Sequence, residues 1–91
     1  MPLDGTSPEV EYEIVLNTAA DLLEERGWCK YQFSKGEQLC LVGAIAHAAD
    51  GAPYASILAY FTKRQRIMNA VKWNDAERRT KEQVIAALRG L

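Results

Sequence analysis

The chain has 91 residues, which is room for one domain, and with 48% apolar and 25% charged residues its composition is that of a globular protein rather than a disordered one. The longest apolar run, residues 39–49, is shorter than a bilayer span and contains a histidine, so we expect no membrane-spanning segment and no membrane partner. The first seven residues have neither a basic region nor an apolar run, which argues against a signal peptide and predicts a cytoplasmic location.

The net charge of −1 hides two halves of opposite charge. Residues 1–50 contain nine acidic and three basic residues, a balance of −6, whereas residues 51–91 contain three acidic and eight basic residues, a balance of +5. Such a division is typical of a nucleic-acid-binding face or of two halves that attract each other. In so small a domain we favour the second interpretation, in which acidic and basic helices pack side by side.

Residues 1–6 are predicted to be a flexible leader, and residues 7–91 a single helical domain. Ser7 is suited to cap a helix, and Pro8 is suited to its first position. Apolar residues then recur at helical spacing until a glycine, a residue type that commonly follows the end of a helix. The spacing predicts a helix over residues 8–26.

The segment after this helix, residues 28–36, is rich in aromatic residues and ends in a turn-like Ser-Lys-Gly sequence. It predicts a short extended segment or a hairpin. Residues 39–49 are apolar all round, which is typical of a helix that is buried on every side, and this run predicts a helix over about residues 38–49. We therefore predict a central helix there, with Gly43 allowing a neighbouring helix to approach closely.

Pro53 is suited to begin the next helix, and the apolar spacing up to residue 73 fits either one bent helix or two short ones. Thr80 and Gln83 have the spacing of a capping box, which predicts a last helix that ends near Gly90. Together these elements predict an all-α fold, a compact bundle of four to five short helices around the buried central helix.

Three short motifs follow one another along the chain: Gly27-Trp28, Cys40-Leu41-Val42-Gly43-Ala44 and Trp73-Asn74-Asp75. In order and spacing they resemble a family of small uncharacterised domains that is found in actinobacteria and in the phages that infect them. The resemblance covers roughly residues 12–89. It implies a biological setting, but it implies no activity, cofactor or site residue.

Cys40 is the candidate catalytic nucleophile of this sequence, because it lies at the start of a predicted helix, where the dipole favours a thiolate. A nucleophile needs a base within hydrogen-bond reach, and His47 lies about 10 Å further along the helix axis. We therefore favour a buried structural cysteine. The chain has two cysteines, Cys29 and Cys40, and one histidine, whereas a structural zinc site needs four ligands. We therefore expect no metal and no cofactor.

The Trp-Asn-Asp motif is the strongest candidate for a binding surface, since tryptophan is enriched where proteins bind each other. A structural role is the alternative, in which the tryptophan closes the core and one of the two polar residues caps a turn. The predicted protein-binding residues are Trp73, Asn74, Asp75, Trp28 and Tyr31.

These observations favour a non-enzymatic protein-interaction module, with a host protein or a second copy of the chain as its partner and, in a phage, a host factor as its target. A cysteine-dependent enzyme is one alternative, with Cys40 as nucleophile and Asn74 or Asp75 as the orienting group. A nucleic-acid-binding accessory protein that uses the basic half of the chain is another. Its candidate residues are Lys63, Arg64, Arg66, Lys72, Arg78 and Arg79.

Overall fold

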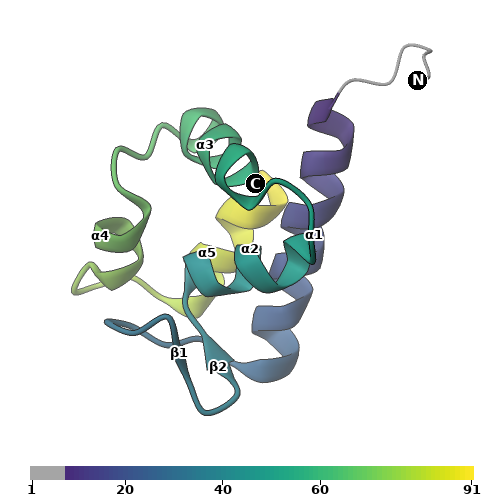
Figure 1. Cartoon of the computed structure of the whole chain (residues 1–91). Helices are drawn as coiled ribbons and strands as arrows, with labels where there is room; N and C mark the ends of the chain where they lie inside the picture. Colours follow the sequence, from purple (N-terminus) through teal and green to yellow (C-terminus); the bar gives the residue numbers. More distant parts are fainter. Residues whose placement is uncertain (1–7) are drawn as a thin grey trace.

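The computed structural model describes residues 8–91, which form five helices and a two-stranded sheet (Figure 1). Helix α1 covers Pro8–Arg26, the boundaries predicted from the sequence. The predicted cap at Ser7 and the predicted leader over residues 1–6 lie outside the described residues. One face of α1 enters the core, where its buried residues are Leu16, Ala19, Ala20 and Leu23.

The aromatic segment after α1 continues into a hairpin of two strands, β1 over Ser34–Lys35 and β2 over Gln38–Leu39. The strands are antiparallel, with Ser34 opposite Leu39. Leu39 also forms a parallel bridge with Trp28. A lone hairpin is marginally stable in water, so the bridge and the full burial of Leu39 hold this one on the body of the protein.

Helix α2, Leu41–Ala49, is the central helix, and it begins at Leu41 rather than near residue 38. The start is later because residues 38–39 pair in the hairpin and Cys40 takes an extended conformation as the N-cap. The prediction that this helix is buried on every side is wrong for one face, where His47 is exposed.

Gly43 lies in α2 where another segment comes very close, as predicted, but that segment is not a helix. A Cβ atom at this position would overlap the carbonyl oxygen of Phe33, in the loop before β1. The same carbonyl accepts a hydrogen bond of 3.1 Å from the backbone N–H of Cys40. The missing side chain of Gly43 therefore lets the aromatic segment pack directly on the start of α2.

The second half of the chain forms three helices, α3 over Tyr54–Gln65, α4 over Ala70–Asp75 and α5 over Lys81–Arg89. Of the two arrangements that the apolar spacing allowed, the chain adopts two short helices, because its backbone turns left-handed where α3 ends. Thr80 and Gln83 form both hydrogen bonds of the predicted capping box at the start of α5.

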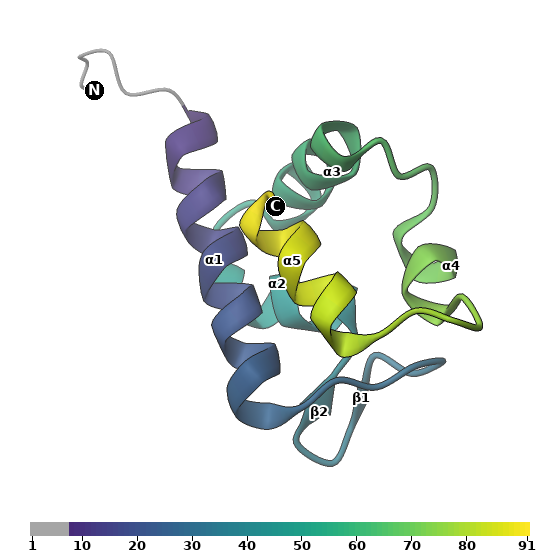
Figure 2. The ribbon, with the colours of Figure 1, turned by 180° about the vertical axis from the view of Figure 1, so that it is seen from behind.

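Helix α1 packs against α2 and α5, and α3, which contacts α2, lies above it in Figure 1. Seen from behind, α5 lies between α1 and the side of the molecule that carries α4 (Figure 2). The fully buried side chains come from several helices and include Leu16, Leu41, Ile45, Phe61 and Leu88. The predicted all-α bundle is thus confirmed. Within residues 8–91, no helix is long and apolar enough to cross a membrane.

Candidate functional site

A pocket of about 190 Å³ opens between the aromatic loop (residues 28–33), the start of α2 and helix α4. Three of its apolar side chains are also well exposed, with exposed fractions of 73% for Tyr31, 51% for Phe33 and 55% for Val71. The pocket therefore combines a largely apolar lining with exposed apolar side chains at its rim. Its lining residues are Tyr31, Gln32, Phe33, Cys40, Val42, Val71, Asn74 and Asp75.

Asn74 lies beneath this pocket and is 1% exposed. Its Oδ1 accepts hydrogen bonds from the indole N–H of Trp28 at 2.6 Å and from the backbone N–H of Leu41 at 3.0 Å. Its Nδ2 donates to the carbonyl of Cys29 at 3.2 Å and to Oδ1 of Asp75 at 2.9 Å. The side-chain amide therefore ties α4 to the aromatic loop and to the first turn of α2, and it faces inward rather than toward a partner.

The next loop residues, Lys30 and Tyr31, are also held by hydrogen bonds to α4 and to the residues just after it. The backbone N–H of Tyr31 donates to Oδ1 of Asp75 at 2.8 Å, and this bond holds Tyr31 at a φ of +67°, in the left-handed region. The ammonium group of Lys30 donates to the carbonyls of Ala76 at 2.7 Å and Glu77 at 3.1 Å, just after α4 ends. Successive loop residues are thus anchored while the Tyr31 side chain stays in solvent.

The two tryptophans are half-buried and contribute to this framework. The indole N–H of Trp28 is bonded to Asn74, and the Lys30 ammonium lies 5.6 Å from the centre of its ring. The guanidinium of Arg79 stacks 3.9 Å from the ring centre of Trp73, and its Nε donates to the Trp73 carbonyl at 2.9 Å. Of the five predicted protein-binding residues, Tyr31 presents the most side chain to solvent, and the other four support the loop and α4.

Cys40 lines the pocket together with Asn74 and Asp75, the two residues proposed as its orienting groups. Its Sγ caps α2 by accepting a hydrogen bond of 3.3 Å from the backbone N–H of Gly43. Asn74 is fully engaged elsewhere, and His47 is exposed near the far end of α2. The geometry therefore supplies Cys40 with a helix cap rather than with an imidazole base.

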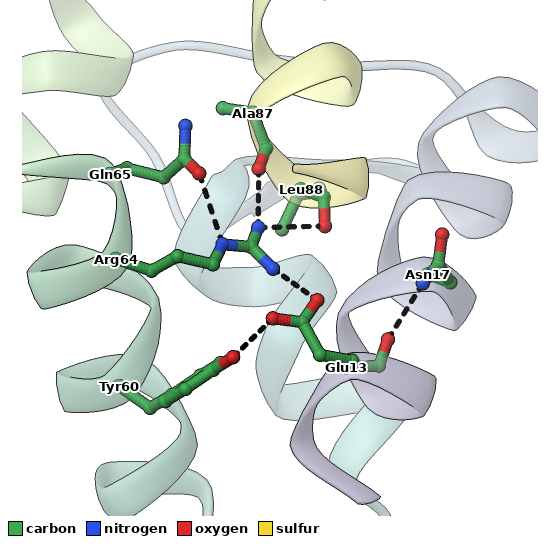
Figure 3. A network of polar contacts seen from close by, with 7 residues as sticks. All are labelled: Glu13, Asn17, Tyr60, Arg64, Gln65, Ala87 and Leu88. Carbon is green, nitrogen blue, oxygen red and sulfur yellow. Dashed lines mark hydrogen bonds and ion pairs between the residues drawn. The ribbon is translucent and has the colours of Figure 1, made fainter. Parts of the chain in front are cut away.

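A second polar cluster joins the three helices α1, α3 and α5 (Figure 3). Glu13 of α1 accepts hydrogen bonds from the hydroxyl of Tyr60 and the guanidinium of Arg64, both of α3. Arg64 also donates to the last carbonyls of α5, at 2.6 Å to Ala87 and 3.1 Å to Leu88. Burial by itself raises the pKa of Glu13, but the bonds from Arg64 and Tyr60 outweigh it and leave that pKa below its ordinary value.

The six predicted nucleic-acid-binding residues fall into two groups: two are engaged inside the fold, and four are exposed. Arg64 is used inside the fold by Glu13 and α5, and Arg79 is stacked on Trp73. The other four are exposed between α3 and α5: Lys63, Arg66, Lys72 and Arg78. The basic half of the chain therefore presents fewer free cations than its sequence suggests.

Two residues of the pocket rim, Phe33 and Val71, are not among the predicted protein-binding residues. Phe33 lies in the aromatic run that was singled out as able to face solvent, and its side chain is indeed 51% exposed. Val71 continues the apolar spacing toward Trp73, which is the pattern of a core residue. Its exposure follows from the separate helix α4, whose buried residues are Ala70 and Asn74.

Comparison with other proteins gives a family and no activity. In the part of the chain described, no three His, Cys, Asp or Glu side chains gather closely enough to hold a metal ion. No curated protein and no solved structure matches the sequence. The sequence model of a family of unknown function, DUF6197, matches residues 7–91, nearly the whole chain. The chain therefore belongs to this family of unknown function.

Proposed function

We propose that this protein is a non-enzymatic protein-interaction module that receives one apolar side chain of a partner protein in the pocket beside Tyr31. The exposure of the Tyr31 side chain and the conformation of its backbone are the observation that carries the proposal. Its side chain is 73% exposed at the rim of an apolar pocket, while its backbone is held in the left-handed region by Asp75. The bond to Asp75 holds the loop on α4, and the exposed ring is left available for a partner.

A tyrosine is a poor residue for the fold at this position. The left-handed conformation costs a residue with a Cβ atom roughly 1–2 kcal/mol, a cost that glycine avoids. Because most of the ring remains in water, burial recovers little of this cost. An aromatic side chain at a strained and exposed position is expected where a partner binds, since aromatic residues contribute much of the energy of protein interfaces.

The loop is also ordered before any partner arrives. Asn74 fixes the carbonyl of Cys29, Asp75 fixes the N–H of Tyr31, and Cys40 fixes the carbonyl of Phe33. Ordering flexible residues on binding lowers affinity, so a surface that is rigid in the free protein loses less free energy when the complex forms. This rigidity supports a binding role for the aromatic loop.

The size and the charge of the site favour a protein partner. Cavities that enclose small-molecule ligands usually measure roughly 300–1,000 Å³, whereas this pocket measures about 190 Å³, which suits a single large side chain. Asp75 is the one charged side chain of the lining and is bonded to the N–H of Tyr31 and to Asn74. Two exposed lysines, Lys35 in β1 and Lys72 in α4, are near lining residues in the sequence. We therefore expect the partner segment to carry acidic residues next to its apolar anchor.

The test is a pull-down from a nuclease-treated lysate of the native host, with the wild type and the Tyr31→Gly variant, followed by mass spectrometry. A protein captured by the wild type should be lost with Tyr31→Gly. Urea unfolding should show that this variant is more stable, by about 1 kcal/mol, because glycine relieves the strained backbone. The matched control is Tyr54→Ala, since Tyr54 is an exposed aromatic of α3 outside the pocket, and this variant should retain the partner.

Two results would contradict the proposal. Equal capture by the wild type and Tyr31→Gly would place the binding surface elsewhere. A pull-down that captures no host protein, together with light scattering that shows a monomer, would exclude both proposed partners: the host protein and a second copy of this chain. A dimer that dissociates in Tyr31→Gly would instead identify the second copy as the partner.

The biological setting is part of the proposal and rests on the motifs. Their resemblance to small domains of actinobacteria and actinobacteriophages suggests an accessory protein of the cytoplasm, which in a phage would act on a host factor. The protein recovered in the pull-down tests this directly, because a host cytoplasmic protein is expected and an envelope protein is not.

Nucleic-acid binding is the second candidate function, and one observation favours it. Lys63, Arg66, Lys72 and Arg78 remain exposed in one stretch of the chain. Phosphate contacts release counterions, so binding should weaken steeply with salt and should fall in a variant with these four residues changed to alanine. No retention on DNA or RNA at low ionic strength would remove this candidate. The cysteine-dependent enzyme would require turnover that is lost in Cys40→Ala.

A further inference from the structure

The two cysteines lie on either side of the aromatic loop in the sequence, and backbone pairing brings them together. Trp28 and Leu39 form a parallel bridge, in which the N–H of Cys29 donates to the carbonyl of Leu39 at 3.1 Å. Each cysteine is the next residue along its segment, so the same register places Cys29 beside Cys40. Paired strands lie about 4.8 Å apart, and disulfides join Cα atoms that are roughly 4.4–6.8 Å apart.

Both thiols are free, and both are held by weak contacts only. The thiol of Cys29 donates to the carbonyl of Gln32 at 3.5 Å, and Sγ of Cys40 accepts from the N–H of Gly43 at 3.3 Å. Sulfur is a weak donor and a weak acceptor, so these contacts are readily exchanged. The closeness of the two thiols also affects the pKa of Cys29, which burial raises and the neighbouring Cys40 raises further.

We infer that Cys29 and Cys40 form a reversible disulfide when the protein meets a peroxide, and that this bond weakens partner binding at the pocket. Cys40 lines the pocket, so hydrogen peroxide reaches it from solvent. Peroxide oxidises the Cys40 thiol to a sulfenic acid and releases one water. The Cys29 thiol then attacks that sulfur, and the S–S bond forms as a second water leaves. Two thiols are oxidised, one peroxide is reduced, and a dithiol reductant reverses the change.

The disulfide alters the wall of the pocket. It draws Sγ of Cys40 away from the N–H of Gly43 and Sγ of Cys29 away from the carbonyl of Gln32. Tyr31 lies inside the ring that the bond closes, so its position relative to α4 shifts. We expect partner affinity to fall roughly tenfold, the effect of losing one anchoring contact. This consequence rests on the proposed function, whereas formation of the disulfide does not.

Mass spectrometry of the peroxide-treated wild type tests the bond directly. Trypsin separates the two cysteines into the peptides 27–30 and 36–63, because lysines or arginines bound both segments. A digest without reductant should contain these two peptides joined, with the loss of two hydrogen atoms. The joined species should disappear after treatment with dithiothreitol, and it should be absent from Cys29→Ser. Sulfinic acid at Cys40, dimers linked between chains or unmodified thiols would each overturn the inference.

Amide hydrogen exchange and partner capture test the switch. The N–H of Gly43 should exchange faster in the oxidised wild type, because its acceptor has been drawn away, and should return to its original rate after treatment with dithiothreitol. Linked peptides with unchanged partner capture would overturn the switch and leave the proposed binding surface standing. A reduced protein that captures no partner would overturn the proposed function, while the result for the disulfide would stand by itself.

Discussion

Asn74 joins segments that are far apart in the sequence and leaves none of its polar atoms unused. Its four hydrogen bonds reach Trp28, Cys29, Leu41 and Asp75. Across residues 8–91, no buried side-chain nitrogen or oxygen lacks a hydrogen-bond partner. A buried amide with complete bonding specifies one arrangement of its neighbours, because every alternative leaves a polar group unpaired. At the scale of the residue, Asn74 therefore determines where the aromatic loop lies.

Replacement of Asn74 by alanine should destabilise the protein by roughly 3 kcal/mol. The indole N–H of Trp28, the N–H of Leu41 and the carbonyl of Cys29 would each lose a buried partner, and each unpaired group costs about 1–3 kcal/mol. Some of this cost is recovered if water enters the space that the amide leaves. Urea unfolding followed by tryptophan fluorescence measures the free energy of unfolding.

Asn69→Ala is the matched control. Asn69 is the exposed N-cap of the same helix and accepts one hydrogen bond of 3.0 Å from the N–H of Lys72, so its loss should cost about 1 kcal/mol. Equal destabilisation by the two variants would mean that Asn74 acts as an ordinary cap, and that the loop is held by other contacts.

The sequence identified the Trp-Asn-Asp motif but did not indicate whether its side chains face the core or the solvent. It offered Asn74 as either a partner-binding residue or a local cap, and three of the four hydrogen bonds of the amide instead reach groups 33 to 46 residues away. An asparagine in a short motif looks the same in the sequence whether its side chain is exposed or buried. Local spacing therefore does not distinguish a surface asparagine from a core one. Tyr31 was found because it belongs to an aromatic run, and its exposure depends on the left-handed backbone that Asp75 holds.

At the scale of the element, Gly43 allows the aromatic loop and α2 to meet. A glycine in a helix interior usually lowers stability, and Gly→Ala usually raises it by about 1 kcal/mol. Here we expect Gly43→Ala to lower the free energy of unfolding by roughly 1–3 kcal/mol, because the new methyl group would overlap the carbonyl of Phe33 and displace the loop. Thermal or urea unfolding measures the change.

Ala46→Gly in the same helix is the reference for helix propensity alone, and it should cost about 1 kcal/mol. A stabilising Gly43→Ala would show that the loop moves aside freely, which would contradict the rigid platform proposed for binding.

Local signals predicted α1 and α5 well because caps and apolar spacing act within a few residues. Proline, acidic first-turn residues and a following glycine bound α1, and the capping box of Thr80 and Gln83 begins α5. The start of α2 was placed too early because Leu39 begins the apolar run that continues through the helix. The hairpin itself was one of the two predicted alternatives, whereas the bridge from Leu39 to Trp28 depends on tertiary packing, and no local pattern predicts it.

At the scale of the whole molecule, the two charged halves of the chain attract each other, as predicted. Each ion pair within residues 8–91 joins an acidic residue of α1 to an arginine of the second half. Arg89 reaches Asp21 at 2.8 Å and Glu24 at 3.2 Å, and Arg64 binds Glu13. Exposed pairs such as those of Arg89 contribute little to stability. The Glu13 cluster matters more because it is half-buried and links α1, α3 and α5.

That cluster should make stability depend on pH on the acid side. The hydrogen bonds of Glu13 hold its pKa in the folded protein below its ordinary value of 4.5, so the unfolded chain binds a proton more readily. The stabilisation is therefore complete above pH 4.5 and is lost as pH falls through the pKa of the folded state. Glu13→Gln should cost about 1 kcal/mol at pH 7, and the difference from the wild type should shrink as the pH is lowered toward 3. Urea unfolding at several pH values measures it.

Glu25→Gln separates this effect from a general loss of negative charge, since Glu25 is an exposed carboxylate of the same helix that pairs with none of the described residues. Its difference from the wild type should stay small across the same pH range. A Glu13→Gln variant whose deficit is constant from pH 7 to pH 3 would show that the carboxylate contributes packing rather than charge. In that case Arg64 would hold the end of α5 through the carbonyls of Ala87 and Leu88 alone, and Arg64→Met would remain destabilising at every pH.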